Sequence, residues 1–461
     1  MAGEVLVITQ DVVGQSMAGP AIRAVEISRC LANDFPVILA APDAPGTEAR
    51  TGEILAYRNN PRELRAAAAV SRLIVIQGAA LELLPWLASL SAPLVVDLYD
   101  PFHLESMHVF SSAPAAYQDA RHRFDLGMIR HQLALGDFFV CASERQRHFW
   151  LGMLSAIGRV EPRGYARDPT FRALIDVVPF GVAGKPPEHS RRVLKGVYPG
   201  IKADDQVVLW GGGLWDWLDP LTLIRALARL QPTHPRLKVF FMGTRRPGDD
   251  AASRRSVDAA VQLARDLGVS ASVIFNDWVP YEDRHNFLLE ADVGVSLGLR
   301  HIEGEYAFRT RILDYIWTGL PTVCTRGDAT ADLVEHYGLG LTVDARSEDQ
   351  LVDALRRVLD DPTARSGRAS EFERVAAQLS WSRATEPLRR FARDPAIAAD
   401  NPRRVGKGRL EREIHAGRER VQHALWLVEA ARASYGSGGP RRLARDLARY
   451  FSAHIPGKRV T

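Results

Sequence analysis

The segment formed by residues 302–323 limits most strongly what this chain can fold into. It reads IEGEYAFRTRILDYIWTGLPTV, an acidic, glycine-containing loop followed by a helical pattern. The helix would bury three apolar residues at i, i+3 and i+4 spacing: Leu313, Ile316 and Trp317. Gly319 and Pro321 would end the helix, and the apolar run 320–323 predicts a return into a sheet. The segment therefore predicts a loop–helix–strand unit.

The loop that opens this unit has the chemistry to hold a phosphorylated sugar. A helix N-terminus offers free N–H groups and a positive dipole end to an anion. Arg309 and Arg311 add two positive charges there, and Glu303 and Glu305 precede them. The loop can thus supply donors for phosphates and carboxylates for sugar hydroxyls, as a nucleotide-sugar site requires.

The same segment resembles the donor-site signature of the retaining glycosyltransferases of family 4, which have the two-domain GT-B fold. In those enzymes a Glu, seven further residues and a second Glu precede a helix that ends Gly-x-Pro. Counting back from Gly319, Asp314 stands at the second Glu, and the resemblance implies that it binds the ribose. Tyr306 stands at the first position, so either Glu305 or Glu303 would contact the donor sugar.

Length and composition fit two globular domains with an appendage. The chain has 461 residues, of which 46% are hydrophobic and 25% charged. Its three cysteines, Cys30, Cys141 and Cys324, are far apart, which argues against a disulfide framework and suits a reducing cytoplasm. The N-terminus lacks a basic region before its first apolar run, so we expect a buried strand there rather than a signal peptide. No apolar stretch reaches the roughly 20 residues that span a bilayer.

Short apolar runs alternate with amphipathic stretches along the chain. We predict buried strands at residues 5–8, 37–41, 73–76, 94–98, 138–141 and 177–181, and then at 207–210, 238–242, 273–275, 293–297 and 321–324. Helical patterns lie between them, at 21–31, 120–135, 221–230, 259–267 and 284–289. This alternation predicts parallel sheets with helices on both faces.

The resemblance extends this pattern to a whole architecture. It implies an α/β chain of GT-B architecture, with two facing Rossmann-like doubly wound domains and a central cleft at the carboxyl ends of their strands. We place an acceptor-side domain at 1–185, a nucleotide-sugar donor domain at 186–380, a cross-over helix at 381–400 and a basic helical tail at 401–461.

The tail differs from the body in charge. Residues 401–461 contain 14 Lys and Arg against 5 Asp and Glu, a net charge of +9. The whole chain is +4, so residues 1–400 carry about −5 by subtraction. Amphipathic patterns at 410–431 and 441–455 could pack on the body or lie on an anionic membrane face. No aromatic platform or binding motif supports nucleic acid as a partner.

Two loops of the first half carry candidate site residues. The loop 14–23 is rich in small residues and resembles the family's first loop, where Gly19 would face the donor's diphosphate. The second loop, 97–103, follows a strand where the family often has a His that contacts the donor sugar. Asp100 stands near its place and His103 follows, so both are catalytic candidates, although a lone His in a loop is commonly just solvated. Asp97 would orient this loop, and Arg23 could lie on a helix surface.

The turn after the second half's first strand departs from the family. Family members have an Arg and then a Lys there, which neutralise the departing diphosphate, whereas this chain has Gly213 and Asp219. Arg309 and Arg311 would replace those cations, and the backbone of Gly212 and Gly213 would add N–H donors. The three residues after the glycines would either shape the site or pack between domains: Trp215, Asp216 and Trp217.

A further stretch resembles the family's nucleobase side. Trp278 and Val279 would pack on the base, or else belong to the core. The chain has no His, Asp or Cys cluster with metal spacing, so we predict no cofactor and no metal.

Together these features predict a retaining, metal-independent glycosyltransferase. It would move a sugar from a nucleotide diphosphate sugar to a hydroxyl of a bacterial surface glycan or a lipid-linked precursor, in the cytoplasm or at the inner face of the membrane. Two alternatives stay open: a nucleotide-sugar epimerase or hydrolase of the same fold, and a non-catalytic nucleotide-sugar-binding subunit.

Overall fold

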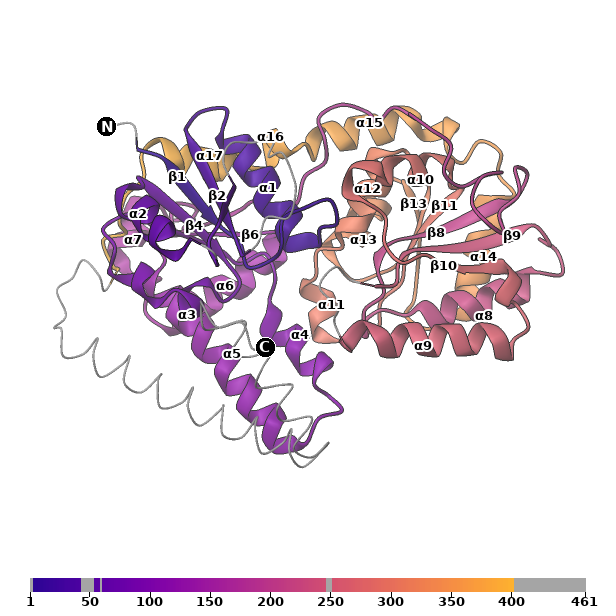
Figure 1. The fold of residues 1–461 in the computed structure, drawn as a ribbon, viewed down its shortest axis with the longest axis horizontal. Helices are drawn as coiled ribbons and strands as arrows, with labels where there is room; N and C mark the ends of the chain where they lie inside the picture. The colour runs from indigo at the N-terminus through magenta and orange to yellow at the C-terminus, as the bar shows by residue number, and fades with distance from the viewer. Residues whose placement is uncertain (1–2, 43–53, 59, 246–250, 402–461) are drawn as a thin grey trace. The chain divides into compact units, whose positions relative to one another are not determined.

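The computed structural model describes residues 3–42, 54–58, 60–245 and 251–401 (Figure 1). The chain divides into two compact units. Unit 1 comprises residues 1–14, 20–178 and 386–461, and unit 2 comprises residues 15–19 and 179–385. The basic tail predicted at 401–461 lies outside the described residues except for Asn401.

Unit 1 is built on a seven-stranded parallel sheet of order β3-β2-β1-β4-β5-β6-β7. Its strands are β1 (Val5–Ile8), β2 (Val37–Ala41), β3 (Ile54–Ala56), β4 (Leu73–Gln77), β5 (Leu94–Asp97), β6 (Phe138–Cys141) and β7 (Ile175–Val177). Its helices are α1 (Gly19–Leu31), α2 (Pro61–Val70), α3 (Ala80–Leu83), α4 (Phe102–Val109), α5 (Ala115–Leu135), α6 (Glu144–Ala156), α7 (Pro162–Arg167) and α17 (Glu386–Arg393), with a 3₁₀ turn η1 (Pro85–Ser89). The core gathers fully buried residues such as Phe139 and Trp150.

Unit 2 is built on a six-stranded parallel sheet of order β10-β9-β8-β11-β12-β13. Its strands are β8 (Gln206–Gly213), β9 (Leu237–Gly243), β10 (Val273–Phe275), β11 (Val293–Ser296), β12 (Thr322–Thr325) and β13 (Gly340–Val343). In Figure 1, α10 (Arg284–Glu290), α12 (Thr310–Trp317) and α13 (Ala329–His336) lie on one side of this sheet, and α8 (Pro220–Leu230), α9 (Ala251–Asp266) and α14 (Glu348–Leu359) lie on the other. The remaining helices are α11 (Ile302–Tyr306), α15 (Ala369–Gln378) and α16 (Trp381–Ala384), with 3₁₀ turns η2 (Ser270–Ser272), η3 (Tyr281–Asp283) and η4 (Ser366–Arg368). Both units are therefore doubly wound α/β domains, as predicted.

Three details differ from the sequence prediction. The strand predicted at 177–181 is wrong, because β7 ends at Val177; Pro179 has no N–H to donate, and the Val178 carbonyl accepts from Arg23 at 2.8 Å. The short strands β3 and β13 were not predicted. The single helix expected at 381–400 is two helices, since Pro387 has no N–H to donate to the carbonyl of Arg383 and lies in the first turn of α17.

The last helix of the described residues, α17, belongs to unit 1. Arg389 of α17 pairs with Asp34 at 2.8 Å, and Arg390 lies 3.3 Å from Asp176. The Phe391 ring stacks on Phe138 with centroids 4.6 Å apart. The chain thus returns to its first unit through α17.

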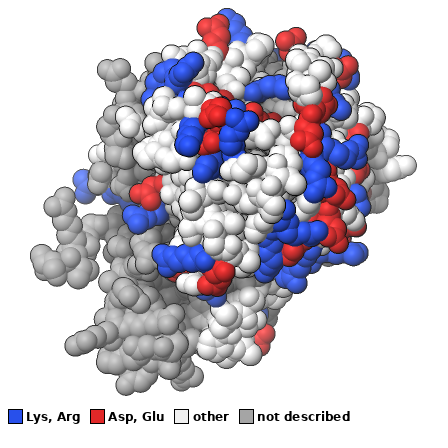
Figure 2. Space-filling model, turned by 90° about the vertical axis from the view of Figure 1, so that its right-hand side faces the viewer, with Lys and Arg blue, Asp and Glu red and all other residues white. Residues whose placement is uncertain are grey.

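The described surface carries charges of both signs, and the three cysteines lie in the interior. On the described face that Figure 2 shows, basic and acidic side chains are interspersed. Of the helices in the described ranges, none combines the length and apolar character needed to cross a bilayer. All three cysteines of the chain are buried and free of disulfides.

Candidate functional site

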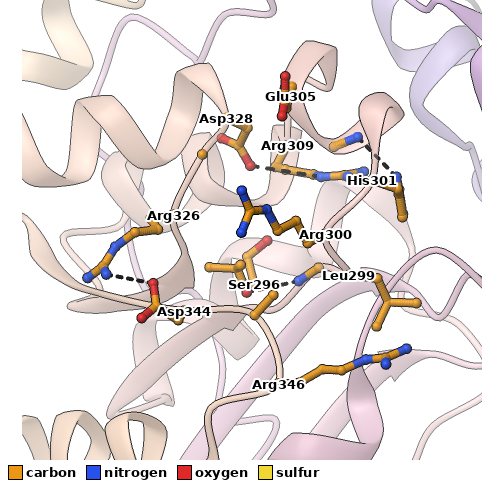
Figure 3. Close-up of a pocket in the computed structure, with 15 residues that line it drawn as sticks. Ser296, Leu299, Arg300, His301, Glu305, Arg309, Arg326, Asp328, Asp344 and Arg346 are labelled. Carbon is orange, nitrogen blue, oxygen red and sulfur yellow. Dashed lines mark hydrogen bonds and ion pairs between the residues drawn. The ribbon is translucent and has the colours of Figure 1, made fainter.

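A pocket of about 550 Å³ opens at the carboxyl ends of β11, β12 and β13 in unit 2 (Figure 3). Parallel strands deliver their following loops to one edge of a sheet, which is where ligands bind in doubly wound folds. The lining residues come from the ends of these strands and the three loops that follow: Ser296, Gly298, Leu299, Arg300, His301, Gly304, Glu305 and Arg309 from β11 onward; Thr325, Arg326, Gly327 and Asp328 from β12 onward; and Asp344, Ala345 and Arg346 after β13. Four arginines therefore face three carboxylates.

The loop after β11 is organised by a short helix rather than being irregular as predicted. His301 caps α11 by accepting the Gly304 N–H at Nδ1, 3.2 Å away. This turns the Glu303 side chain inward, where its carboxylate accepts from Arg309 at 2.9 Å. Glu303 is 6% exposed and does not line the pocket, whereas Glu305 is exposed and lines it. The structure thus brings Glu303, Glu305 and Arg309 together and leaves only Glu305 open to a ligand.

The helix that follows is fixed by Tyr315. Its hydroxyl accepts the Gly211 N–H at 2.8 Å and donates to the Val295 carbonyl at 2.8 Å, so one side chain joins α12 to β8 and β11. A Cβ on Gly294 would lie 2.7 Å from the Tyr315 ring, so this strand position needs glycine. Gly319, with φ +65°, then ends α12 in the left-handed conformation.

Asp328 and Asp344 are the remaining acids of the pocket. Asp328 caps α13, and its Oδ1 accepts from the N–H groups of Thr330 and Ala331, both at 2.8 Å. Burial raises the pKa of Asp328. The charge of Arg309, whose Nε lies 4.0 Å from the Asp328 Oδ2, opposes this effect without cancelling it. Asp344 pairs with Arg326 at 2.7 Å. Sequence reasoning missed Arg300, Arg326 and Arg346, although each follows a predicted or actual strand end.

The turn after β8 forms a second group of predicted residues, outside this pocket. Arg311 donates to the Gly213 carbonyl at 3.1 Å, and its guanidinium lies 5.0 Å from the centre of the Trp210 ring. Burial lowers the pKa of Arg311 to about 10. Gly212 is exposed, with φ +70°. Arg311 therefore lies beside the glycine turn and does not line the pocket.

The residues after the glycines are tied to unit 2. The rings of Trp215 and Trp217 stack with centroids 5.6 Å apart. Asp216 accepts from Arg255 at 2.7 Å and from the Ser256 hydroxyl at 2.6 Å. Asp219, at the position where the family has Lys, caps α8 through the Thr222 N–H. Asp216 and Asp219 therefore both make contacts that stabilise unit 2.

The predicted ribose and base residues lie on neighbouring elements of the same unit. Asp314 pairs with Arg284 at 3.1 Å, and its side chain is 32% exposed. The Trp278 ring covers Gly243 at the end of β9, where a Cβ would come within 2.8 Å of it, and Val279 is buried. Arg284 also lies over the Tyr281 ring, 3.7 Å from its centre. A ligand would have to compete with Arg284 for Asp314.

The candidates of the first loops fall on both units. Gly19 is the first residue of α1 and belongs to unit 2. A Cβ added at Gly19 would contact Phe180 at 3.9 Å and would meet no other atom within 4 Å. Asp100 is half-buried in unit 1. His103 is on α4 rather than in a loop, is 4% exposed, and stacks on Phe149 with centroids 5.7 Å apart. Burial, and then the charge of His122, lowers its pKa to about 4. His103 is therefore neither solvated nor open in this structure.

Arg23 of α1 and Asp97 at the end of β5 form a buried ion pair. Arg23 Nε donates to Asp97 at 2.6 Å, and both side chains are at most 1% exposed. This pair joins α1 to the end of β5, so the expectation that Asp97 orients the loop has a structural basis, and a surface position for Arg23 is wrong. Within the described ranges, no group of three or more His, Cys, Asp or Glu side chains is placed to hold a metal.

Part of the chain matches a known family of enzymes. Residues 199–374 match the family model described as "Glycosyl transferases group 1", which covers less than half of the chain. The match contains the whole pocket, the β8 turn and Asp314. The recognition made from the sequence is confirmed for group 1, and assignment to family 4 stays a prediction.

Individual relatives are distant. The chain is 28% identical over 212 residues to a D-inositol 3-phosphate glycosyltransferase of Corynebacterium diphtheriae, and 29% identical over 225 residues to one of Mycobacterium bovis. These matches cover 46% and 47% of this chain, and the chain spans only 46% and 41% of those relatives.

Solved structures confirm the GT-B fold. HepE of Anabaena in complex with UDP-glucose matches with a TM-score of 0.62 and 15% identity, over 85% of this chain and 99% of that one. Sucrose-phosphate synthase of Thermosynechococcus elongatus matches with a TM-score of 0.61 and 16% identity, over 85% and 98%. At such identities the likeness concerns the fold alone.

Proposed function

We propose that this chain is a retaining glycosyltransferase that moves a sugar from a nucleotide diphosphate sugar to a hydroxyl acceptor, in the synthesis of a bacterial surface glycan or lipid-linked glycan. The observation that carries the proposal is that the residues matched by the group 1 model include the whole pocket. The pocket in turn contains the carboxylate of Glu305, which is unpaired within the described part of the chain. Two further findings support it: the relatives are named as glycosyltransferases, and a structural neighbour binds UDP-glucose.

The residues of unit 2 would divide the work. Arg311, beside Gly213, would hold the donor's diphosphate, Asp314 its ribose, and Glu305 its sugar hydroxyls. The acceptor oxygen would bond to the anomeric carbon on the face from which the phosphate leaves. The bond between that carbon and the phosphate oxygen would break, and the departing phosphate would take the acceptor's proton. This step needs no protein nucleophile, and positive charge near the phosphate would lower its barrier.

A turnover assay tests the proposal. The full chain is incubated with UDP-glucose and related donors, with and without hydroxyl acceptors, including D-inositol 3-phosphate and lipid-linked glycan precursors. Release of nucleoside diphosphate only with an acceptor, and a product that keeps the donor's anomeric configuration, is expected. Release without acceptor would identify a hydrolase, and donor that binds but stays intact would identify a binding subunit.

The reaction is proposed to be independent of metal. The arginines would supply the positive charge that a divalent cation supplies elsewhere. Turnover should therefore be unchanged by EDTA; a loss that Mg²⁺ or Mn²⁺ restores would contradict this part of the proposal.

The tail is proposed to hold the enzyme at an anionic membrane face, at the inner side of the cell membrane. Its net charge of +9 supports this, since each basic residue near such a surface contributes about 1 kcal/mol. Asn401 must be kept in any truncated chain, because its buried amide donates to Leu135 O at 2.8 Å and to Asp137 Oδ1 at 2.6 Å.

A further inference from the structure

Two arginines of the pocket are available to a ligand. Arg300 and Arg346 line it, are exposed, and make no ion pair or hydrogen bond with the described residues. The pKa of Asp344 is lowered chiefly by a hydrogen bond from the Gln350 side chain. Arg300 adds to this lowering only through its positive charge. In Figure 3 the Arg300 guanidinium points into the middle of the pocket, and Arg346 lies at its lower edge.

The other basic side chains of the pocket are engaged. Arg309 donates to Glu303 at 2.9 Å, and Arg326 pairs with Asp344 at 2.7 Å. Of the lining acids, Asp328 is held by three hydrogen bonds from α13 and by the nearby Arg309. The free groups are therefore two guanidinium cations and one carboxylate, that of Glu305.

The backbone at Arg346 is strained. Its φ is +62°, in the left-handed region that a residue with a Cβ enters at a cost and that glycine enters freely. The strained residue lies just before Ser347, which caps α14 by accepting the Gln350 N–H at 3.4 Å. Strain of this kind is found at ligand-binding positions, and here it holds a cationic side chain at the pocket.

We propose that this pocket binds a compact oxyanion, a phosphate or a carboxylate, carried by a sugar or polyol that is the acceptor or the transferred unit. Arg300 and Arg346 bind the oxyanion, since a guanidinium matches two of its oxygens at once, and Glu305 accepts a hydroxyl of the same ligand. The inference rests on the proposed function, and it assigns a second anion site besides the donor's diphosphate, which falls to Arg311. Arg311 does not line this pocket.

Calorimetric titration of the full chain tests the site with three probes: glucose, glucose 6-phosphate and glucuronate. Each is titrated with and without a saturating nucleoside diphosphate, chosen as the one among UDP, GDP and ADP that binds. At least one charged probe should bind tenfold or more tighter than glucose, keep its affinity beside the nucleotide, and weaken as salt is raised. Preference for one of the two charged probes identifies the oxyanion.

Two variants assign the binding to the named residues. Arg300→Ala and Arg346→Gly should each weaken the charged probe about tenfold and leave glucose and nucleotide binding unchanged. Arg346→Gly should also keep or raise the melting temperature, because glycine relieves the positive φ. Arg236→Ala is the matched control: it removes an exposed arginine of the same unit, paired with Asp204 and outside the pocket.

Several results would overturn the inference: equal binding of glucose and the charged probes, displacement of the charged probe by nucleotide, or variants that behave like Arg236→Ala. Nucleotide binding separates this failure from that of the proposed function. If a nucleoside diphosphate binds but no charged probe does, only the second anion site is refuted. If charged probes bind through Arg300 and Arg346 but no nucleotide binds, the proposed function is refuted.

Discussion

Arg311→Met is the substitution that separates catalysis from folding most clearly. The Arg311 guanidinium has one hydrogen bond, to Gly213 O at 3.1 Å, and lies over the Trp210 ring. Its Nη1 is buried and has no hydrogen-bond partner among the described residues. Methionine keeps most of the length of the side chain and removes the charge, so it tests whether a buried cation is kept there to bind phosphate.

The expected effect on stability is small because opposing terms nearly cancel. Burial lowers the pKa of Arg311 to about 10, well below the ordinary value of an arginine, so holding the charge in the folded state costs on the order of 3 kcal/mol. Because the folded pKa is the lower one, this cost is fully present below about pH 10 and falls only as the pH rises from there toward the ordinary pKa of an arginine. Methionine removes the cost but loses a hydrogen bond of about 1.5–3 kcal/mol and a cation–π contact of about 0.5–2 kcal/mol.

The expected effect on turnover is large. A preorganised donor at a developing charge contributes about 2–4 kcal/mol, which is roughly a 30- to 900-fold loss in turnover when it is removed. Calorimetric melting and steady-state release of nucleoside diphosphate measure the two effects on the same preparation.

Arg365→Met is the control for burial of an arginine. Arg365 lies in the same unit, its pKa is also lowered by burial, and it donates to four backbone carbonyls, including Leu289 O and Thr318 O, each at 2.8 Å. Its loss leaves those carbonyls unpaired, so it should lower the melting temperature without a specific effect on nucleotide affinity. Wild-type turnover in Arg311→Met, or destabilisation as large as that of Arg365→Met, would refute the assigned role.

The remaining predictions concern single groups and the tail. Glu303→Gln should lower the free energy of unfolding by about 1.5–3 kcal/mol in a denaturant melt, because it weakens the buried pair with Arg309; unchanged stability would show that the pair is not structural. Asp314→Asn should weaken nucleoside diphosphate and donor alike by about 1.5–3 kcal/mol in calorimetry, and unchanged affinity would remove it from the site. Since the folded pKa of His103 is lowered to about 4, stability should fall by on the order of 3 kcal/mol from pH 6.5 to 4, and His103→Phe should flatten that slope. A chain that ends after Asn401 should stay folded but no longer sediment with anionic vesicles; vesicle binding equal to that of the full chain would contradict the role of the tail.

The strands of both units could be predicted because their interiors are continuous apolar runs. The predictions at β1, β2, β6 and β10 match the observed bounds. The strands β3 and β13 were missed because they are short edge strands with little burial: three of the four residues of β13 are only partly buried. A continuous apolar run predicts a strand even at the edge of a sheet, as in β10 (Val273–Phe275), whereas β13 contains Gly340 and Thr342 and has no such run.

The site could be predicted only in part, because its charges converge through the fold. Arg309 was found because it precedes a helix in a recognisable segment. Arg300, Arg326 and Arg346 are single residues in three separate loops, and only the parallel order of β11, β12 and β13 brings them to one pocket. The sequence also could not show that Glu303 forms an ion pair with Arg309.

The central claim is that unit 2 binds a nucleotide sugar through Arg311 and Asp314. Titration calorimetry of the full chain with UDP, GDP and ADP, repeated on Arg311→Met and Asp314→Asn, tests it most directly. One nucleoside diphosphate should bind the wild-type chain, and both variants should bind it at least tenfold more weakly while melting within a few degrees of the wild type. Failure of all three nucleotides to bind, or equal binding to the wild type and both variants, would contradict the account.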